Sequence, residues 1–272
     1  MTDSGVDLLR TLFETVRAED RAALLPYLTV GIPDAGSSVA MFEAMAEAGA
    51  DGFEIGIPYA DPLMDGPVIA EAAERSLAAG MTIARALEIT TEVVASTGKP
   101  VLLMTYTNPV LYYGIERFSR AAADSGAAGL IIADLPIEEA DPFLAAARSS
   151  GLGMALFAAP TTTDERLAAI SDANPSFVYA VASLGVTGER AETSILGQGL
   201  AARIRAISDV PIVAGVGIST PEQAATAAAT ADGVIVGSAL VRKVLEATDP
   251  REATAALSVA VTALCESVER TH

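Results

Sequence analysis

Histidine and cysteine are almost absent from the 272-residue chain, and their scarcity restricts its chemistry. The only histidine is His272, the final residue, where chains commonly fray. A histidine triad, a histidine-rich zinc site and a histidine general base are therefore disfavoured. Because Cys265 is the single cysteine, no intrachain disulfide can form, and a reducing cytoplasm fits. We predict that the chain holds no metal and that carboxylates, tyrosines and backbone N–H groups carry its chemistry.

Positive charge is also scarce, since 17 lysines and arginines stand against 35 acidic residues, a formal net charge of −18. Such a charge repels phosphodiester backbones and anionic headgroups, so nucleic acid and membranes are poor partners. The sequence has no uncharged apolar run of about 18 residues that could span a bilayer. Residues 1–10 have neither the basic leader nor the apolar core of an export signal. We expect a soluble, cytoplasmic protein that holds any anionic substrate through local backbone dipoles.

Short β-branched apolar runs alternate with alanine-rich helical stretches along the chain. Eight runs, each ending in Gly, Pro, Asp or Thr, begin near Leu25, Gly52, Pro100, Gly129, Gly153, Phe177, Pro211 and Gly233. This alternation indicates a parallel sheet, and eight repeats favour closure into an α/β fold of the (β/α)8 TIM-barrel type, which needs roughly 250 residues. The alternative is an open doubly wound sheet, which usually has fewer strands and a glycine fingerprint after the first one.

One barrel domain is predicted to span residues 1–272, because no linker or low-complexity tract divides the chain. Extra helices are expected at its two ends, over Val6 to Arg17 and Arg251 to Arg270. The second strand–helix unit is longer than the others around residues 59–81. In such barrels the catalytic groups lie at the C-terminal ends of the strands, so polar residues at those ends are the candidates for a site.

The second predicted strand carries an acid, Glu54, between glycines. Strand periodicity places Gly52, Glu54 and Gly56 on one face and Phe53, Ile55 and Ile57 on the other. The bulky face suits the surrounding helices, so Glu54 should point into the barrel mouth, with the glycines leaving room for a ligand. A buried carboxylate without a cation has a raised pKa, which suits proton transfer. The alternative is a structural glutamate paired with a distant Lys or Arg.

A second acid, Asp65, follows this strand in a loop whose prolines limit its freedom. The loop acids Asp61 and Asp65 could face a substrate or cap the next helix. Because Asp65 precedes Gly66 and Pro67, capping chemistry alone makes it a plausible helix start. Spacing therefore leaves a catalytic role and a capping role both open for Asp65.

Glycine recurs at the ends of the last three predicted strands, in residues 185–188, 214–218 and 236–238. Such glycines let backbone N–H groups approach a ligand, and Ser238 opens a helix whose N-terminal dipole favours an anion. Barrels that bind phosphate commonly hold it after strands seven and eight, so Gly217 with Gly237 and Ser238 predicts a phosphate site. Each glycine alone would be explained by a tight turn.

Residues 53–67, FEIGIPYADPLMDGP, closely resemble the signature of tryptophan synthase α subunits, E-[ILV]-G-[IV]-P-[FY]-[SA]-D-P-x-x-D-G-P. The GVTG at residues 185–188, and GVGIS at 215–219 followed by Gly237 and Ser238, resemble the family's sixth-loop and phosphate-site motifs. The resemblance covers essentially the whole chain. It implies a carbon–carbon lyase that cleaves indole-3-glycerol phosphate into indole and glyceraldehyde 3-phosphate by a retro-aldol reaction in tryptophan biosynthesis.

The same resemblance assigns roles to the two acids. Glu54 matches the glutamate that protonates the indole carbon being released and assists removal of the side-chain hydroxyl proton. Asp65 matches the aspartate that stabilises positive charge developing at the indole nitrogen. Both are therefore expected to be catalytic.

Substrate contacts are also implied by the resemblance. Tyr27, Met104 and Phe157 match positions that sandwich the indole ring, although ordinary barrel core is the alternative for the last two. Tyr179 matches the tyrosine beside the catalytic glutamate, and Thr187 matches the threonine that helps the sixth loop close. The phosphate contacts are Gly188, Gly217, Gly237 and Ser238.

A partner is implied as well. In the family the α subunit binds a pyridoxal-phosphate β subunit, expected here in a heterotetramer of two α and two β subunits, and passes indole to it through a tunnel. The cofactor belongs to the partner, so none is expected in this chain. The corresponding contact surface comprises Asp61, Pro62, Asn108, Pro109, Asp134 and Pro136.

Three other functions are left open by the sequence. An isomerase or epimerase on a similar barrel would share the phosphate site, but it gives no reason to carry Glu54 and Asp65 together. A non-enzymatic binding module would make the acids and glycines a coincidence. A stand-alone indole-3-glycerol-phosphate lyase would keep the site without binding a β subunit.

Overall fold

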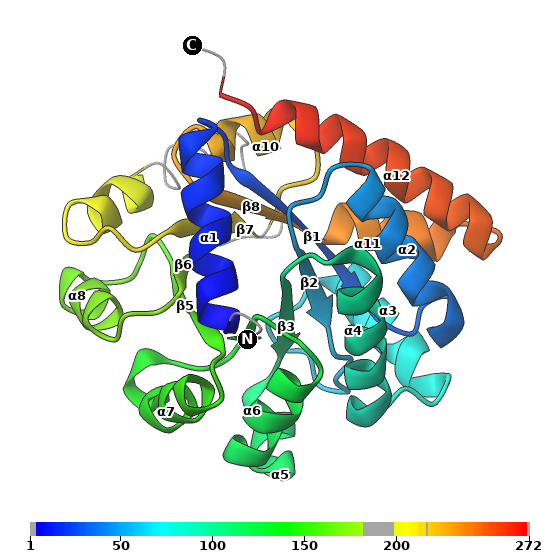
Figure 1. The fold of residues 1–272 in the computed structure, drawn as a ribbon, viewed down its shortest axis with the longest axis horizontal. Helices are drawn as coiled ribbons and strands as arrows, with labels where there is room; N and C mark the ends of the chain where they lie inside the picture. The colour runs from blue at the N-terminus through cyan, green and yellow to red at the C-terminus, as the bar shows by residue number, and fades with distance from the viewer. Residues whose placement is uncertain (1–3, 182–198, 216, 271–272) are drawn as a thin grey trace.

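A closed parallel barrel forms the centre of the protein (Figure 1). The structure, a computed structural model, describes residues 4–181, 199–215 and 217–270. The strands are β1 (Ala23–Thr29), β2 (Phe53–Gly56), β3 (Val101–Thr105), β4 (Gly129–Ile132), β5 (Gly153–Ala158), β6 (Phe177–Val181), β7 (Ile212–Gly215) and β8 (Gly233–Val236). They lie in sequence order, and β1 pairs with both β2 and β8. The predicted barrel is confirmed, each strand starts within two residues of its predicted position, and the open-sheet alternative is wrong.

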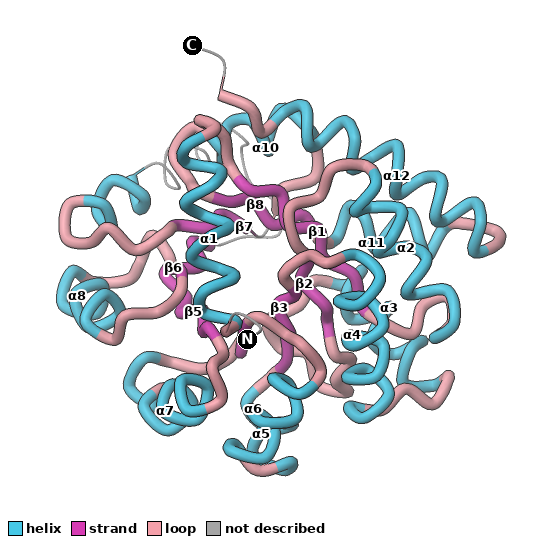
Figure 2. The backbone as a smooth tube through the Cα atoms, in the orientation of Figure 1, coloured by secondary structure: helices cyan, strands magenta, loops and turns pink. Residues whose placement is uncertain are grey.

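Helices surround the barrel (Figure 2). They are α1 (Gly5–Ala18), α2 (Ala35–Glu47), α3 (Pro67–Ala78), α4 (Ile83–Thr97), α5 (Thr107–Tyr113), α6 (Ile115–Asp124), α7 (Asp141–Ser149), α8 (Asp164–Asp172), α10 (Pro221–Ala228), α11 (Ser238–Glu246) and α12 (Pro250–Ser267), with a 3-10 turn, η1 (Ile137–Glu139). Both predicted terminal helices form, as α1 and α12. The extra length of the second unit forms α3. Within the described ranges, no helix is long and apolar enough to cross a membrane.

Capping side chains define where many of these helices begin. A Ser, Thr or Asp side chain accepts a backbone N–H bond at the start of six of them, the capping residues being Ser4, Asp34, Thr82, Thr163, Thr220 and Asp249. These local signals fix the helix boundaries, whereas burial of one face against the barrel holds each helix in place.

Helix α1 packs across the N-terminal end of the barrel (Figure 1). Its Leu9 and Phe13 are 1% and 2% exposed, and the Phe13 ring centroid lies 5.9 Å from that of Phe177 at the start of β6. A Cβ atom on Gly153, where β5 begins, would lie 2.5 Å from Leu9 Cδ1. The absence of a side chain there makes room for α1, which therefore fills this end of the barrel.

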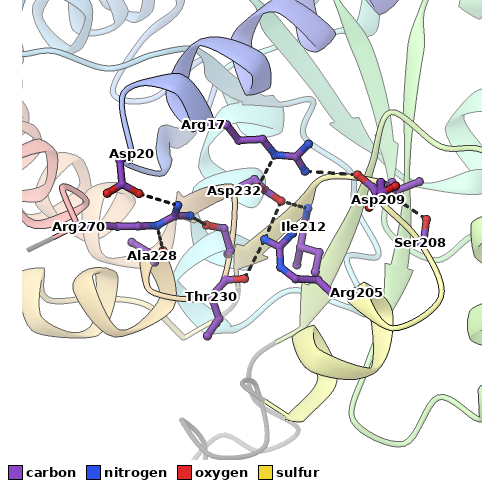
Figure 3. A network of polar contacts seen from close by, with 12 residues as sticks. Arg17, Asp20, Arg205, Ser208, Asp209, Ile212, Ala228, Thr230, Asp232 and Arg270 are labelled. Atoms are coloured by element: carbon purple, nitrogen blue, oxygen red, sulfur yellow. Dashed lines mark hydrogen bonds and ion pairs between the residues drawn. The ribbon is translucent and has the colours of Figure 1, made fainter. Parts of the chain in front are cut away.

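The buried carboxylate of Asp232 ties α1 to β7 and β8 at the same end (Figure 3). It accepts hydrogen bonds from Arg17 Nε at 2.8 Å, from Arg205 Nη2 at 3.1 Å and from the backbone N–H of Ile212 at 2.8 Å. Burial raises the pKa of Asp232, but the bonds from Arg17 and the Ile212 N–H, together with the charges of Arg205 and Arg17, outweigh it and hold the pKa below its ordinary value of 3.8. This network lies opposite the C-terminal mouth, where barrel residues mainly serve stability.

The register between strands decides which side chains enter the barrel. Tyr27 pairs with Glu54, Gly56 with Met104, and Phe157 with Tyr179. Paired residues of adjacent parallel strands point to the same side of the sheet. The opposite face of β2 meets the helices, since the rings of Phe53 and Phe42 of α2 are 5.1 Å apart. The two predicted faces of the second strand are therefore confirmed.

Candidate active site

Glu54 is buried inside the barrel with an unpaired oxygen. The residue is 3% exposed, and its Oε2 has no hydrogen-bond partner among the described residues. Burial raises the pKa of Glu54, and the charge of Asp65 raises it further, to about 8. No cation in the described part of the chain pairs with Glu54, which counts against the alternative of a structural ion pair. A carboxyl group with this pKa is largely protonated at neutral pH and can donate a proton.

Asp65 lies half-buried between β2 and α3. The N-cap of α3 is Gly66, and no side chain in the described ranges, Asp65 included, caps this helix, so the capping alternative for Asp65 is wrong. Burial raises the pKa of Asp65 to about 6, against a hydrogen bond from Tyr106 that lowers it. At neutral pH, therefore, Asp65 is mostly a carboxylate while Glu54 is mostly protonated.

Two tyrosines bring hydroxyl groups near these acids. Tyr27 of β1 is 4% exposed, and its hydroxyl is 3.0 Å from Thr29 Oγ1. Tyr179 of β6 is 6% exposed. Burial raises the pKa of both phenols, and the negative charges of Glu54 and Asp65 raise it further. Both hydroxyls stay neutral, so they can orient a ligand without adding charge.

Glycines on the neighbouring strands accommodate these two rings. A Cβ atom on Gly56 would lie 2.2 Å from the Tyr27 hydroxyl, and one on Gly215 would lie 2.2 Å from the Tyr179 hydroxyl. Real Cβ contacts are not this short, so a side chain at either position would displace a tyrosine. The space beside Gly56, which we expected to admit a ligand, is filled by Tyr27.

The predicted indole-binding residues lie on three different strands, Tyr27 on β1, Met104 on β3 and Phe157 on β5. The Phe157 and Tyr179 rings are stacked, with centroids 4.7 Å apart and an interplanar angle of 23°. Met104 belongs to the buried core, whereas Phe157 is only half-buried. Stacked aromatic rings and a buried thioether are apolar groups suited to contact a planar aromatic molecule.

The predicted phosphate residues lie at the ends of adjacent strands. Val213 of β7 pairs with Gly233 of β8, and Gly217 and Gly237 follow the C-terminal ends of these two neighbouring strands. Gly237 is the N-cap of α11, which begins at Ser238, and among the described residues no side chain caps this helix. Its first-turn N–H groups and positive dipole end suit an anion. Thr187 and Gly188 lie outside the described residues.

The six predicted contact residues lie in the segments after β2, β3 and β4, which are neighbours in the barrel. Four of them are exposed, and Pro62 and Pro109 are half-buried. The segments are also bonded to each other, because Asn108 Nδ2 donates to the Tyr59 hydroxyl at 3.2 Å and the Thr107 N–H donates to Asp134 at 2.7 Å. They therefore form one continuous surface at the barrel mouth.

Sequence reasoning missed two features here. Tyr106, directly after β3, contacts the Asp65 loop, and only its place at a strand end hinted at a role. Four large exposed apolar residues in the β2–α3 loop and α5 were also missed: Leu63, Met64, Leu111 and Tyr112. The sequence pattern of these segments does not separate the exposed residues from buried ones such as Ile57 and Val110.

Two coupled acids at the mouth of a closed (β/α)8 barrel, beside strand ends suited to an anion, define an α/β-barrel enzyme. The family model described as "Tryptophan synthase alpha chain" matches residues 13–269. A tryptophan synthase alpha chain from Streptomyces avermitilis is 43% identical over 242 residues, covering 89% of this chain and 87% of the relative. One from Acidothermus cellulolyticus is 45% identical over 254 residues, covering 93% and 94%.

Solved structures agree with the sequence matches. Tryptophan synthase from M. tuberculosis, in an aminoacrylate- and BRD0059-bound form, superposes with a TM-score of 0.87 at 40% identity, covering 97% of this chain and 98% of that one. Tryptophan synthase subunit alpha from Legionella pneumophila gives 0.87 at 32% identity, covering 98% and 99%. The chain belongs to the tryptophan synthase alpha chain family. The predicted family is thus confirmed, and with it the class of enzyme, a lyase.

Proposed function

We propose that this lyase cleaves indole-3-glycerol phosphate into indole and glyceraldehyde 3-phosphate, with Glu54 and Asp65 as its catalytic residues. The reaction breaks the bond between indole C3 and the side-chain carbon that bears a hydroxyl. C3 must gain a proton and the hydroxyl must lose one. The proposal is supported mainly by the pair of acids at the barrel mouth, because their pKa values differ: about 8 for Glu54 and about 6 for Asp65.

Glu54 acts as the proton shuttle in this proposal. Because its pKa is about 8, it begins protonated at neutral pH and can donate to indole C3. The resulting carboxylate then accepts the proton of the side-chain hydroxyl as the carbon–carbon bond breaks and the aldehyde forms. Glu54 ends in the protonated state in which it began, so the cycle needs no other proton source. Its unpaired Oε2 supports this role, since a substrate atom would supply the missing partner.

Asp65 acts as the electrostatic partner. Protonation at C3 places positive charge on the indole nitrogen, and a carboxylate beside that nitrogen stabilises the charge. The pKa of about 6 keeps Asp65 ionised at the pH where Glu54 is still protonated. Partial burial strengthens the effect, because charges interact more strongly where water is excluded.

The residues around Glu54 and Asp65 provide the proposed contacts to the substrate. We propose that the indole ring lies among Tyr27, Met104 and Phe157, with Tyr179 beside Glu54. The phosphate would bind to the N–H groups at Gly217, Gly237 and Ser238, with Thr187 and Gly188 of the sixth loop completing the site. A chain with net charge −18 repels anions at long range, so these local dipoles must supply the attraction.

We further propose that a tryptophan synthase β subunit docks on the loops after β2, β3 and β4, in a heterotetramer of two α and two β subunits. Leu63 and Tyr112, at 79% and 93% exposed, give this surface an apolar character, and an exposed patch of large apolar side chains commonly marks an interface. Pyridoxal phosphate would belong to that partner. In this proposal residues 1–272 act as one catalytic domain in the cytoplasm.

The proposal is tested by incubating the purified chain with indole-3-glycerol phosphate and measuring free indole by a colour reaction. Glu54→Gln preserves size but cannot shuttle a proton, so turnover should fall roughly 10²- to 10⁴-fold with little change in KM. Glu47→Gln, at an exposed position on α2, is the matched control and should keep full activity. Normal turnover in a folded Glu54→Gln protein would remove Glu54 from the mechanism.

A further inference from the structure

We propose that Tyr106 is a positioning residue that holds Asp65 in place for the cleavage reaction; this inference rests on the function proposed above. Tyr106 directly follows β3, and its side chain is 2% exposed. It reaches from the end of one strand to the loop that follows the neighbouring strand, β2. Tyr106 lies outside the family signature at residues 53–67.

The contacts of Tyr106 are concentrated on the residues next to and including Asp65. The backbone N–H of Met64 donates to the Tyr106 hydroxyl at 3.2 Å, and the Asp65 carboxylate, one residue further on, is close enough for Asp65 and Tyr106 to shift each other's pKa. Its ring centroid lies 5.3 Å from that of Tyr59, near the start of the same loop. Tyr106 thus contacts both ends of residues 59–65 and restricts where the Asp65 carboxylate can lie.

The direction of these bonds follows from the phenol group. A hydroxyl has one proton to donate, and because Met64 donates to the oxygen, that proton is free for Asp65. Burial raises the pKa of Tyr106, and the charge of Asp65 raises it further, so the hydroxyl stays a donor. A donor beside a carboxylate stabilises the ionised form and lowers the pKa of Asp65, which opposes the effect of burial.

The loop is also connected to the surface on its other side. Asn108 of α5 donates to the Tyr59 hydroxyl at 3.2 Å, and Tyr59 packs on Tyr106. Tyr106 and α5 are consecutive in the chain, so the loop is held by one short segment, residues 106–108. A change in the position of this segment would therefore move Asp65.

The test compares Tyr106→Phe, which removes only the hydroxyl, with Tyr113→Phe, a matched change in α5 away from the acids. Activity is measured as kcat and KM for indole release across pH, in chains that carry either Asp65 or Asp65→Asn. We expect Tyr106→Phe to lower kcat roughly 10- to 100-fold, the effect of losing a hydrogen bond to a charged group, with KM nearly unchanged. The acidic limb of the pH profile should move above its position near pH 6, and Tyr113→Phe should change neither.

The double variant separates positioning from a general structural effect. If Tyr106 acts through Asp65, then Tyr106→Phe should cost less than about twofold once Asp65 is already Asn. The inference is overturned if the two substitutions lower kcat independently, so that their fold-losses multiply in the double variant. It is also overturned if the acidic limb of Tyr106→Phe stays at its native position. Either result leaves the catalytic role of Asp65 intact. Near-normal activity of Asp65→Asn alone would overturn the proposed role of Asp65, and this inference with it. The pH position of the limb does not depend on the active fraction, so partial unfolding does not obscure the result.

Discussion

Replacing Asp65 with Asn should lower the pH at which Glu54 loses its proton. Two causes hold the pKa of Glu54 near 8, first burial and then the charge of Asp65. Asn removes only the second. Because burial is the larger cause, the pKa should fall by less than half of the way from about 8 to the ordinary value of 4.5. A fall of about one pH unit would correspond to roughly 1.4 kcal/mol of interaction between the two carboxylates.

The assay is the pH dependence of kcat/KM for indole release, which reports the ionisation of groups in the free enzyme. The native chain should give a bell, with Asp65 ionising near pH 6 and Glu54 near pH 8. In Asp65→Asn the acidic limb should disappear, and the alkaline limb of the residual activity should move to lower pH. Glu74→Gln, an exposed charge change on α3, should leave both limbs in place. An alkaline limb in Asp65→Asn that is unchanged or moves upward would refute the coupling of the two acids.

Three further predictions concern the phosphate site, the partner and stability. Gly237→Val should raise KM about tenfold and weaken competition by inorganic phosphate, since a Cβ atom there lies 3.2 Å from Tyr27 Cδ1 and crowds the backbone donors; an unchanged KM counts against the phosphate site. A cognate β subunit should stimulate indole release tenfold or more and elute with this chain on a sizing column, whereas full activity alone with no complex would favour a stand-alone lyase. Asp232→Ala should destabilise the fold by about 1–3 kcal/mol, because the buried N–H of Ile212 loses its acceptor while Arg17 and Arg205, at 39% and 41% exposed, can still be solvated; the exposed control Asp172→Ala should leave the melting temperature nearly unchanged. Since the folded pKa of Asp232 is lowered, its stabilisation is present above pH 3.8 and is lost as pH falls through the folded pKa, so the melting temperatures of the native chain and Asp232→Ala should converge in acid.

The strands and the inward direction of Glu54 could be predicted because their signals are local. Alternation with period two identifies the faces of β2, and strand-end glycines mark where each unit turns. The role of Asp65 could not be decided by spacing, since a helix start preceded by Asp65 and Gly66 admits either residue as the cap, and the structure places the cap at Gly66.

Contacts between distant residues could not be predicted from local pattern. Tyr106 meets Met64 across 42 positions, and Arg17 meets Asp232 across 215. The same limit explains Gly56, where the expected room for a ligand is filled by a tyrosine from the neighbouring strand. The fold and the inward direction of Glu54 were thus accessible from the sequence, whereas the contacts that set the pKa values of Glu54 and Asp65 required the three-dimensional arrangement.

The packing of α1 against the strand starts has a consequence for the movement of small molecules. Leu9 and Phe13 occupy the N-terminal end of the barrel, so among the described residues this end gives no passage to the interior. Substrate entry and product exit must then share the opposite opening. An uncharged product as small as indole would be lost to bulk water whenever that opening is uncovered, whereas a protein seated over it would receive each molecule as it leaves. Two side chains far from any reacting atom thereby set the direction in which the product travels.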